Sequence, residues 1–476
     1  MTGAPPAQIL PWLFPRLLGG VYFLAFSSLL AQVLGLYGSQ GILPIGVYLK
    51  ALREFRGKRA YRLCPTLFWF GSSDRVLKGS ALLGVVLSLL LVAGAPPVPL
   101  LFFLWLLYLS FVTAGQEFLS YQWDALLLET GFMTIFLALA TPAPFITVFT
   151  CRFFLFRFIF SAGAVKLLSG DPTWRNLTAL SYHYETQPLP NRLGWYAHHL
   201  PEKVQKLSTL GTFVYELAVP LLALGPEPAR LACFILLVSF QGLIFATGNY
   251  GFFNILTMAL AVPLLDDRHF RLAGDFLAVP AATAGGVETV AVSIIFAIFL
   301  SLNICRLVML FYRPYWLSRL LAFPSRLLIS NPYGLFAVMT TNRYEFVIEG
   351  SNDRKSWEPY EFRFKPGDPR RPLLQAAPHQ PRLDWQMWFA ALDPATIEPW
   401  LDNLRLRLLQ GSPPVLALLR RNPFPGVPPR FIRLTVYRYR FADLGARRRE
   451  GRWWEREQIG RSDTMTLREK EEGSNE

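Results

Sequence analysis

Long uninterrupted apolar runs constrain this chain more than any other feature of its sequence. They lie before about residue 312, at 12–31, 78–95, 98–114, 125–147, 150–168, 209–225, 229–247, 251–265 and 288–311. A helix of about 20 apolar residues crosses the ~30 Å hydrocarbon core of a bilayer. We therefore predict an α-helical polytopic membrane bundle of about nine transmembrane helices. The run at 251–265 and the boundary near Thr150 are its weakest points.

The overall composition agrees with a membrane protein. Hydrophobic residues make up 52% of the chain and charged residues only 17%, whereas soluble domains are about 25% charged. The formal net charge of +14 would suggest nucleic acid for a soluble protein. Here many arginines flank apolar runs or lie near the C-terminus, where they suit lipid headgroups and orientation signals. We therefore expect membrane lipids, and no nucleic acid, as partners.

The cysteines and the N-terminus carry little chemistry of their own. Cys151, Cys233 and Cys305 fall in apolar runs and Cys64 in a basic loop, so we expect small buried hydrophobes rather than disulfides or a metal site. The first apolar run continues to about Leu36, beyond the length of a cleavable signal. It is expected to be a first transmembrane helix that also serves for targeting.

Nine spans would place four polar, aromatic-rich loops on the same side of the membrane as the C-terminal end. These loops are Gly35–Pro44, Gln116–Asp124, Asp171–Pro201 and Gly248–Gly251. The positive-inside rule argues against a non-cytoplasmic position for this side. The segment between the first of these loops and the next span carries six basic residues, Lys50, Arg53, Arg56, Lys58, Arg59 and Arg62. These residues would fit a helix lying on the membrane surface instead.

The sequence changes character after Pro314. Short segments at 344–348 (YEFVI), 361–364 (EFRF) and 431–441 (FIRLTVYRYRF) have strand-like composition, and prolines cluster at 369–381 and 423–429. This pattern predicts a C-terminal β-sandwich-like domain. We divide the chain into a transmembrane domain at 1–314, a soluble β-rich domain at 325–445 and a charged, disordered tail at 446–476.

A charged residue within a predicted span needs a partner or a function, and five such residues are candidates here. They are Glu129, Arg152, Arg157, Lys166 and Glu216. Arg152 and Lys166 are near the ends of their run and are expected to reach toward the membrane surface. Arg157 is deeper, and we expect it to pair with Glu129 or Glu216. Such a pair would tie helices together, although a buried polar site is the alternative.

The polar loops hold the other candidate site residues: Trp123, Asp124, Asp171, Trp174, Arg175, His183, Glu185, His198 and His199. His183 and Glu185 could perform general acid–base chemistry if buried. No metal site is expected, since neither HExxH nor a ligand triplet appears. The favoured interpretation is a rigid, hydrogen-bonded loop that shapes a surface. Asn176 begins an Asn-Leu-Thr sequon, a possible glycosylation site.

Specific runs of sequence go further than composition. They are 171–190 (DPTWRNLTALSYHYETQPLP), 195–201 (WYAHHLP), 248–254 (GNYGFFN), 343–357 (RYEFVIEGSNDRKSW), 379–392 (HQPRLDWQMWFAAL), GLYG…GILP near the N-terminus and QWDALLLETG at 122–131. In this order, and over nearly the whole chain, they resemble the lipase maturation factor family.

The resemblance implies a membrane-embedded chaperone with no cofactor, whose clients are secreted lipases or other exported proteins. It implies an endoplasmic reticulum membrane in a eukaryote and the cytoplasmic membrane in a bacterium, with the C-terminal domain on the non-cytoplasmic side. The high Arg, Leu and Pro content would fit a bacterial or another high-GC source, and in a bacterium the lipase client is in question. Neither the client nor the oligomeric state follows from the sequence.

The segment 382–389 (RLDWQMWF) supplies candidate client-binding residues, namely Arg382, Trp385, Trp388 and Phe389. Trp and Arg are enriched at protein interfaces. The same aromatics would also serve as the core of the β-domain, and alternate residues of a strand would allow both.

Two other functions remain open at this point. One is a membrane enzyme with the fold of vitamin K-dependent carboxylases, to which the family is distantly similar. It would act on a lipid-like or quinone substrate through His183, Glu185 and Asp124. The other is a scaffold whose β-domain binds carbohydrate or lipid headgroups. The absence of P-loop, GxGxxG and GxSxG motifs from the sequence argues against several enzyme classes.

Overall fold

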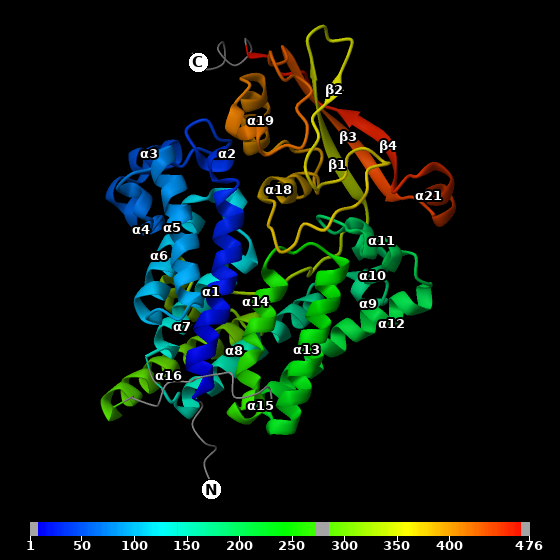
Figure 1. The fold of residues 1–476 in the computed structure, drawn as a ribbon. Helices are drawn as coiled ribbons and strands as arrows, with labels where there is room; N and C mark the ends of the chain where they lie inside the picture. Colours follow the sequence, from blue (N-terminus) through cyan, green and yellow to red (C-terminus); the bar gives the residue numbers. More distant parts are fainter. Residues whose placement is uncertain (1–7, 140, 272–284, 468–476) are drawn as a thin grey trace.

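The protein has two parts, a helical bundle and a C-terminal domain that covers one end of it (Figure 1). The computed structural model describes residues 8–139, 141–271 and 285–467. Helix α1 (Ile9–Leu30) runs along the bundle, from the end that carries the N-terminus to the end beneath the C-terminal domain. The last nine residues of the expected tail lie outside the described residues.

The bundle is built from helices of very different lengths. After α1 they are α2 (Val33–Tyr37), α3 (Ile45–Arg56), α4 (Ala60–Leu63), α5 (Asp74–Val92), α6 (Pro97–Ala114), α7 (Gln122–Leu137), α8 (Phe145–Leu168), α9 (Pro172–Arg175), α10 (Ala179–Thr186), α11 (Arg192–His198), α12 (Glu202–Phe213), α13 (Glu227–Thr247), α14 (Phe253–Leu260), α15 (Asp267–Arg271), α16 (Gly286–Phe311) and α17 (Tyr315–Arg326). Shorter turns are η1 (Gly57–Arg59), η2 (Leu67–Trp69), η3 (Gln116–Leu119), η4 (Val214–Ala218), η5 (Val219–Leu224) and η6 (Val262–Leu264).

Seven helices among the described residues are long and apolar enough to cross a membrane, which supports an integral membrane protein. They are Ile9–Leu30, Asp74–Val92, Pro97–Ala114, Phe145–Leu168, Glu202–Leu224, Glu227–Thr247 and Gly286–Phe311. The predicted count of nine is not confirmed. The expected span at 125–147 contains α7, which ends at Leu137, and the start of α8, which begins directly after Pro144. The expected span at 251–265 contains only α14 and η6.

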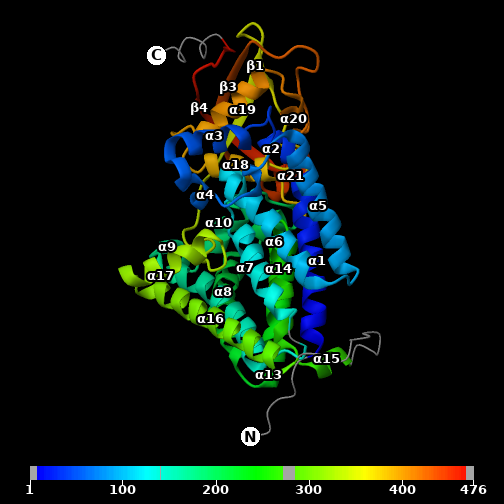
Figure 2. The same cartoon turned by 90° about the vertical axis from the view of Figure 1, so that its left-hand side faces the viewer.

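The basic segment after the first loop forms α3, η1 and α4 (Figure 2). These elements lie at the end of the bundle that the C-terminal domain covers. Val47 and Phe55 of α3 are exposed beside its basic residues, as expected for a helix that lies on a membrane surface. Helix α17 likewise exposes Tyr315, Trp316 and Phe323.

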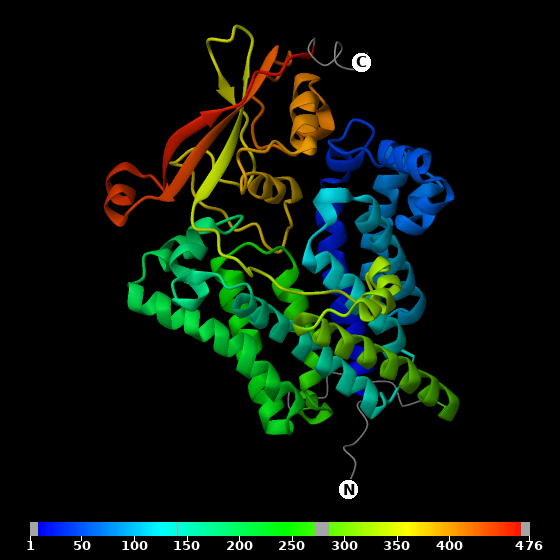
Figure 3. The same cartoon turned by 180° about the vertical axis from the view of Figure 1, so that it is seen from behind.

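The C-terminal domain contains one four-stranded antiparallel sheet, ordered β2-β1-β3-β4. Its strands are β1 (Arg343–Ser351), β2 (Glu358–Pro359), β3 (Phe431–Phe441) and β4 (Trp454–Arg461), and its helices are α18 (Arg382–Ala390), α19 (Pro399–Leu409), α20 (Pro413–Leu416) and α21 (Leu444–Glu450). Arg343 is opposite Tyr439 and Ser351 opposite Phe431 in the central pair of strands. Seen from behind, the sheet stands over the green helices of the bundle (Figure 3).

The predicted sandwich is not confirmed, because the described residues form a single sheet covered by helices and loops. The expected strand at 361–364 makes only an isolated bridge between Glu361 and Arg421. Pro366 and Pro369, which follow it, lack the N–H groups that a ladder needs. The segment RLDWQMWF, considered as a strand, is the helix α18. Its aromatic residues are therefore arranged by helical spacing and not by alternation.

The prediction that the chain is disordered from residue 446 onward is wrong for the first part of that segment, which is folded. Residues 446–450 belong to α21, and β4 pairs with β3 from Phe441↔Trp454 to Thr435↔Arg461. The composition of this segment is charged, but Trp453 and Trp454 are buried against Tyr439 and Phe441. These two aromatic anchors fix a strand whose other residues are mostly exposed.

Candidate functional site

All four polar loops of the bundle contact the C-terminal domain. In the first loop, Gly41 O accepts a hydrogen bond from Arg407 Nε at 2.9 Å and Gln40 O one from Ser412 Oγ at 2.8 Å. In the fourth loop, Asn249 Nδ2 donates to Leu374 O at 2.9 Å. The junction between bundle and C-terminal domain is therefore the place where the predicted surface loops gather.

Helix α2 and α20 approach each other closely at this junction. A Cβ atom on Gly35 would lie 2.4 Å from Pro414 O and 2.7 Å from Leu418 Cγ. Only glycine allows this contact between backbones. The GLYG run of the first loop therefore has a packing role against the C-terminal domain.

Arg382 connects the second loop to the C-terminal domain. It is completely buried, and its Nη1 and Nη2 donate to Asp124 Oδ2 and Oδ1 at 2.9 and 2.8 Å. Its Nη1 also donates to Phe118 O at 2.8 Å. The sequence-based hypothesis that Arg382 binds a client has no support in this position, because the guanidinium is enclosed and paired. A planar guanidinium matched to a carboxylate fixes both distance and orientation.

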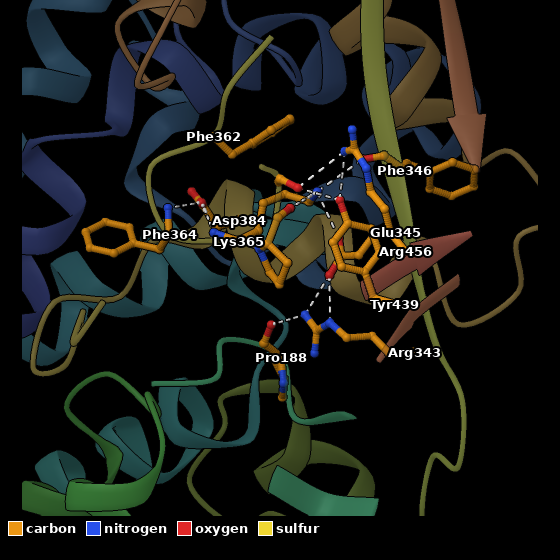
Figure 4. A network of polar contacts seen from close by, with 12 residues as sticks. Pro188, Arg343, Glu345, Phe346, Phe362, Phe364, Lys365, Asp384, Tyr439 and Arg456 are labelled. Carbon is orange, nitrogen blue, oxygen red and sulfur yellow. Dashed lines mark hydrogen bonds and ion pairs between the residues drawn. The ribbon is translucent and has the colours of Figure 1, made fainter. Parts of the chain in front are cut away.

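Arg343 of β1 connects the third loop to the sheet (Figure 4). Its guanidinium donates to the carbonyls of Gln187 at 2.5 Å and Pro188 at 2.9 Å, and its Nη2 lies 2.6 Å from Glu345 Oε1. Lys365 Nζ lies 2.8 Å from the other oxygen of the same carboxylate. This buried Arg–Glu–Lys cluster holds the backbone of the loop after α10 against β1.

Arg157 of α8 has a third set of buried partners. Its Nη2 lies 2.6 Å from Glu129 Oε1 on α7, its Nε donates to Asn303 Oδ1 of α16 at 2.7 Å and its Nη1 to Asn331 O at 2.8 Å. Glu129 Oε2 accepts a hydrogen bond from Tyr333 Oη at 2.7 Å. Of the two carboxylates considered for Arg157, the structure brings Glu129 to it.

The other carboxylate, Glu216 of η4, pairs with Lys166 of α8. Lys166 Nζ lies 2.9 and 2.7 Å from Glu216 Oε1 and Oε2. Lys166 therefore does not reach toward the membrane surface as predicted, because the neighbouring helix supplies a carboxylate. Arg152 is also paired, with Asp266 Oδ1 at 3.0 Å.

The predicted acid–base pair His183 and Glu185 is not formed. Both lie on α10, where residues two apart do not face each other. His183 Nε2 lies 3.2 Å from Tyr250 Oη, and burial lowers the pKa of His183 to about 4. Glu185 Oε2 accepts a hydrogen bond from Phe441 N at 2.6 Å.

The nearest imidazole to Glu185 is His198, whose Nε2 lies 3.9 Å from Glu185 Oε2. Burial raises the pKa of Glu185 and lowers the pKa of His198 to about 4, so burial disfavours the charged form of both groups. His199 Nδ1 lies 2.8 Å from Trp195 O. Within the described residues, no group of three or more His, Cys, Asp and Glu side chains is placed to hold a metal ion.

The first part of the third loop is held by hydrogen bonds to the segment that precedes β1. Asp171 caps α9 by accepting from Thr173 N at 2.7 Å, and it accepts from Met339 N at 2.6 Å. Trp174 is buried and donates from Nε1 to Phe336 O at 3.0 Å. Arg175 and the sequon residue Asn176 are exposed. The loop thus packs on the 336–339 segment and presents its sequon outward.

Aromatic side chains line a pocket of 610 Å³ at the junction. Tyr121 and Trp123 come from the bundle, and Trp123 lies 4.8 Å from Trp385 of α18 between ring centroids. Trp385 and Trp388 are buried, whereas Phe389 is 40% exposed at the pocket. Of the four candidate client-binding residues, Phe389 alone offers a large accessible surface. Trp388 Nε1 donates to Thr186 O at 2.8 Å, a contact with the third loop.

Sequence reasoning missed the cluster of Arg343, Glu345 and Lys365 and the pairing of Lys166. The sequence does indicate part of the Arg343 cluster. Arg343 and Glu345 are two residues apart on a strand, so their side chains share a face, and the apolar Phe346 and Ile348 lie beside them. No local signal identifies Lys365, which follows in a proline-rich segment. The partner of Lys166 depends on which helix neighbours α8.

Comparisons with known proteins agree with this arrangement. A family model described as "Lipase maturation factor transmembrane domain" matches residues 10–272, and one described as "Lipase maturation factor C-terminal domain" matches residues 329–464. The chain is 35% identical to Lipase maturation factor 2 of Homo sapiens, over 94% of this chain and 81% of that protein. It is 34% identical to Lipase maturation factor 1 of Bos taurus, over 94% and 86%. No solved structure matches the chain significantly.

Proposed function

Because this chain belongs to the lipase maturation factor family, we propose that it is a membrane-embedded maturation factor without catalytic activity. Its clients are secreted lipases or related exported proteins, which it assists to reach their active folded or dimeric state. The names of the relatives support a lipase as the client class. The division into a membrane domain at 1–314 and a client-handling C-terminal domain from 325 onward belongs to this proposal.

The observation that carries the proposal is the aromatic pocket at the junction. Its accessible surface includes Phe389 and Leu392 of the C-terminal domain and Val338 of the connecting segment, which are 40%, 43% and 68% exposed. A chaperone has to offer apolar surface to a client that has not yet buried its own. Buried ion pairs hold the walls of this pocket, so its shape is kept while its apolar face stays accessible.

The pocket opens on the side of the membrane that bears the C-terminal domain, and we place that side outside the cytoplasm. In a eukaryote the protein would lie in the endoplasmic reticulum membrane, where exported proteins fold. The exposed Asn176 supports a test of this position. After expression in eukaryotic cells, an endoglycosidase should shift the wild-type protein and leave Asn176→Gln unshifted. An unmodified wild type would argue against the lumenal assignment.

The direct test of function is the specific activity of secreted lipases from cells with and without this chain. We expect lipase antigen to persist and its activity per unit of antigen to fall when the chain is removed. The wild-type chain should restore the activity. Unchanged specific activity across the secreted lipases would contradict the proposal.

A matched pair of variants tests the pocket itself. Leu392 lines it at 43% exposure, while Leu444 of α21 lies outside it at 45% exposure. Leu392→Ser, combined with Phe389→Ser, should abolish the restoration of lipase activity, and Leu444→Ser should restore it like the wild type. Equal restoration by both proteins would mean that the client binds elsewhere.

A further inference from the structure

A second cavity, of 470 Å³, lies within the bundle near the third loop. Its walls are formed by α8, by α12 with η4 and by α13, and its roof by α10 and neighbouring residues of the third loop. Apolar side chains such as Phe158, Ile159, Leu243 and Ile244 make up most of the lining. The volume is within the about 300–1,000 Å³ typical of small-molecule sites.

The cavity has a lateral side toward the surrounding lipid. Leu243 lines the cavity and is nevertheless exposed on the bundle surface, as are the nearby Leu210 and Val214 of the opposite wall. Helix α13 packs against η5, but it makes little contact with α12, which packs on α10 instead. The two helices thus meet near η5 and separate toward the third loop. The exposed Leu243 therefore marks the side on which an apolar chain from the bilayer would reach the cavity.

One of the few polar groups in this mostly apolar lining is the buried amide of Gln241. Gln241 is only 4% exposed, and its Oε1 accepts a hydrogen bond from Asn254 Nδ2 at 2.8 Å. Its Nε2 donates none of the hydrogen bonds described here, and it is not among the enclosed side-chain atoms that lack a partner, so this amide nitrogen is open to the cavity. An N–H group in a mostly apolar cavity is stabilised by a hydrogen-bond acceptor, so an acceptor bound in the cavity would stabilise this arrangement.

The remaining polar groups of the cavity leave no net charge. Lys166 and Glu216 form an ion pair with each other. His183, whose pKa burial lowers to about 4, is neutral at physiological pH and contacts Tyr250 through Nε2. The three donors of Lys166 are already used by Ala162 O and the two Glu216 oxygens. The imidazole and the Glu216 carboxylate still offer hydrogen bonds, with no excess charge to neutralise a phosphate or a carboxylate. The lining therefore complements an uncharged polar head.

From these observations we propose that the cavity binds a neutral glycerolipid of the diacylglycerol class. One acyl chain lies between α12 and α13, and the ester and hydroxyl oxygens lie among Gln241, Glu216 and His183. Such a ligand satisfies the Gln241 amide by an ester carbonyl and introduces no charge. The site is distinct from the aromatic pocket at the junction and does not depend on the identity of the client.

The test uses the full chain in phosphatidylcholine nanodiscs and a diacylglycerol that carries a diazirine in one acyl chain. Irradiation should label peptides from α12 and α13, in a manner that saturates with probe and is competed by unlabelled diacylglycerol. Labelling that does not saturate would overturn the proposal. Competition by oleic acid or phosphatidylglycerol, with none by diacylglycerol, would overturn it as well, because it would show an anionic head.

Two glycines provide matched variants. Gly211 lines the cavity, Gly242 faces outward from α13, and a Cβ on either one would meet no atom within 4 Å. Gly211→Phe should fill the cavity and reduce the saturable labelling at least tenfold, while Gly242→Phe should label like the wild type. Equal labelling of both variants would overturn the proposal.

Melting temperatures without ligand separate filling of the cavity from unfolding. We expect the two glycine variants to melt like the wild type, and added diacylglycerol to raise the melting temperature of all but Gly211→Phe. Gln241→Met gives a second readout, since it keeps the volume and removes the amide. It should weaken the competition by diacylglycerol several-fold; unchanged competition would exclude the proposed head-group contact.

Discussion

Arg382 and Asp124 form a two-point ion pair between residues 258 positions apart in the chain. One residue begins helix α18 of the C-terminal domain and the other lies in the first turn of α7 in the bundle. Neither side chain is exposed. The pair therefore fixes how the C-terminal domain sits on the membrane bundle, and with it the geometry of the aromatic pocket, which Trp385 and Trp123 line from the two sides.

Removing one partner of this pair should destabilise the protein strongly. Arg382→Met leaves the Asp124 carboxylate buried without its counter-charge, which costs about 3–5 kcal/mol in unfolding free energy. The double variant Arg382→Met/Asp124→Leu should recover a large part of that loss. Chemical unfolding in detergent micelles measures both. A loss below about 1 kcal/mol in Arg382→Met would show that water reaches the carboxylate.

The intramembrane charges give a second prediction, with an internal control. A double-mutant cycle of Arg157→Met and Glu129→Leu should show a coupling of about 1–3 kcal/mol, because the two groups are in direct contact. The same Arg157→Met change combined with Glu216→Leu should be additive within about 0.5 kcal/mol, since Glu216 pairs with Lys166. Strict additivity in the first cycle, or strong coupling in the second, would contradict this assignment.

The contrast between these ion pairs shows which contacts can be predicted from the sequence and which cannot. A charged group within an apolar run demands a partner, so the sequence predicts that Arg157 is paired. It leaves Glu129 and Glu216 as equal choices, because the decision depends on which helices are neighbours. The pair of Arg382 and Asp124 has no sequence signal at all, since it joins two segments that are distant in the chain.

The strands show the same limit. Alternation and β-branched or aromatic composition predict β3 with its observed ends, Phe431 and Phe441. The strand β4 could not be predicted, because only Trp454 is buried and its exposed, charged residues show no alternation of apolar and polar side chains. In α18 a short aromatic segment without clear periodicity is compatible with strand or helix. Its helical form places Trp385 and Trp388 in the interior and Phe389 at the pocket.

The burial of His379 predicts that the folded protein loses stability in mild acid. Burial, with nearby Arg382 and Arg363, lowers the pKa of His379 to about 4, against about 6.5 in the unfolded chain. Between these values the unfolded form binds the proton more readily, so stability is complete above pH 6.5 and decreases as the pH falls toward 4. From pH 7.5 to pH 5 this histidine should account for about 2 kcal/mol.

The variant His379→Gln isolates this contribution. A glutamine can still hydrogen-bond Ser28 Oγ, which lies 2.9 Å from His379 Nδ1, but it does not titrate. Unfolding free energies at pH 7.5 and pH 5 should therefore differ by about 2 kcal/mol less in the variant than in the wild type. An identical pH dependence in the two proteins would mean that His379 is protonated in the folded state as easily as in the unfolded chain.

Two neighbouring aromatic residues of α18 should respond differently to truncation. Trp388 is 8% exposed and donates a hydrogen bond to Thr186 O, whereas Phe389 is 40% exposed at the pocket. Trp388→Ala removes a buried ring and leaves a carbonyl without its donor, which should cost about 3–5 kcal/mol in unfolding free energy. Phe389→Ala should cost less than about 1.5 kcal/mol and yet weaken binding of a lipase client by tenfold or more. Client binding at equal protein concentration, measured beside unfolding, separates the two effects. A stable Trp388→Ala protein with impaired client binding would instead place Trp388 in the binding surface, and a Phe389→Ala protein that binds normally would remove the aromatic pocket from the client site.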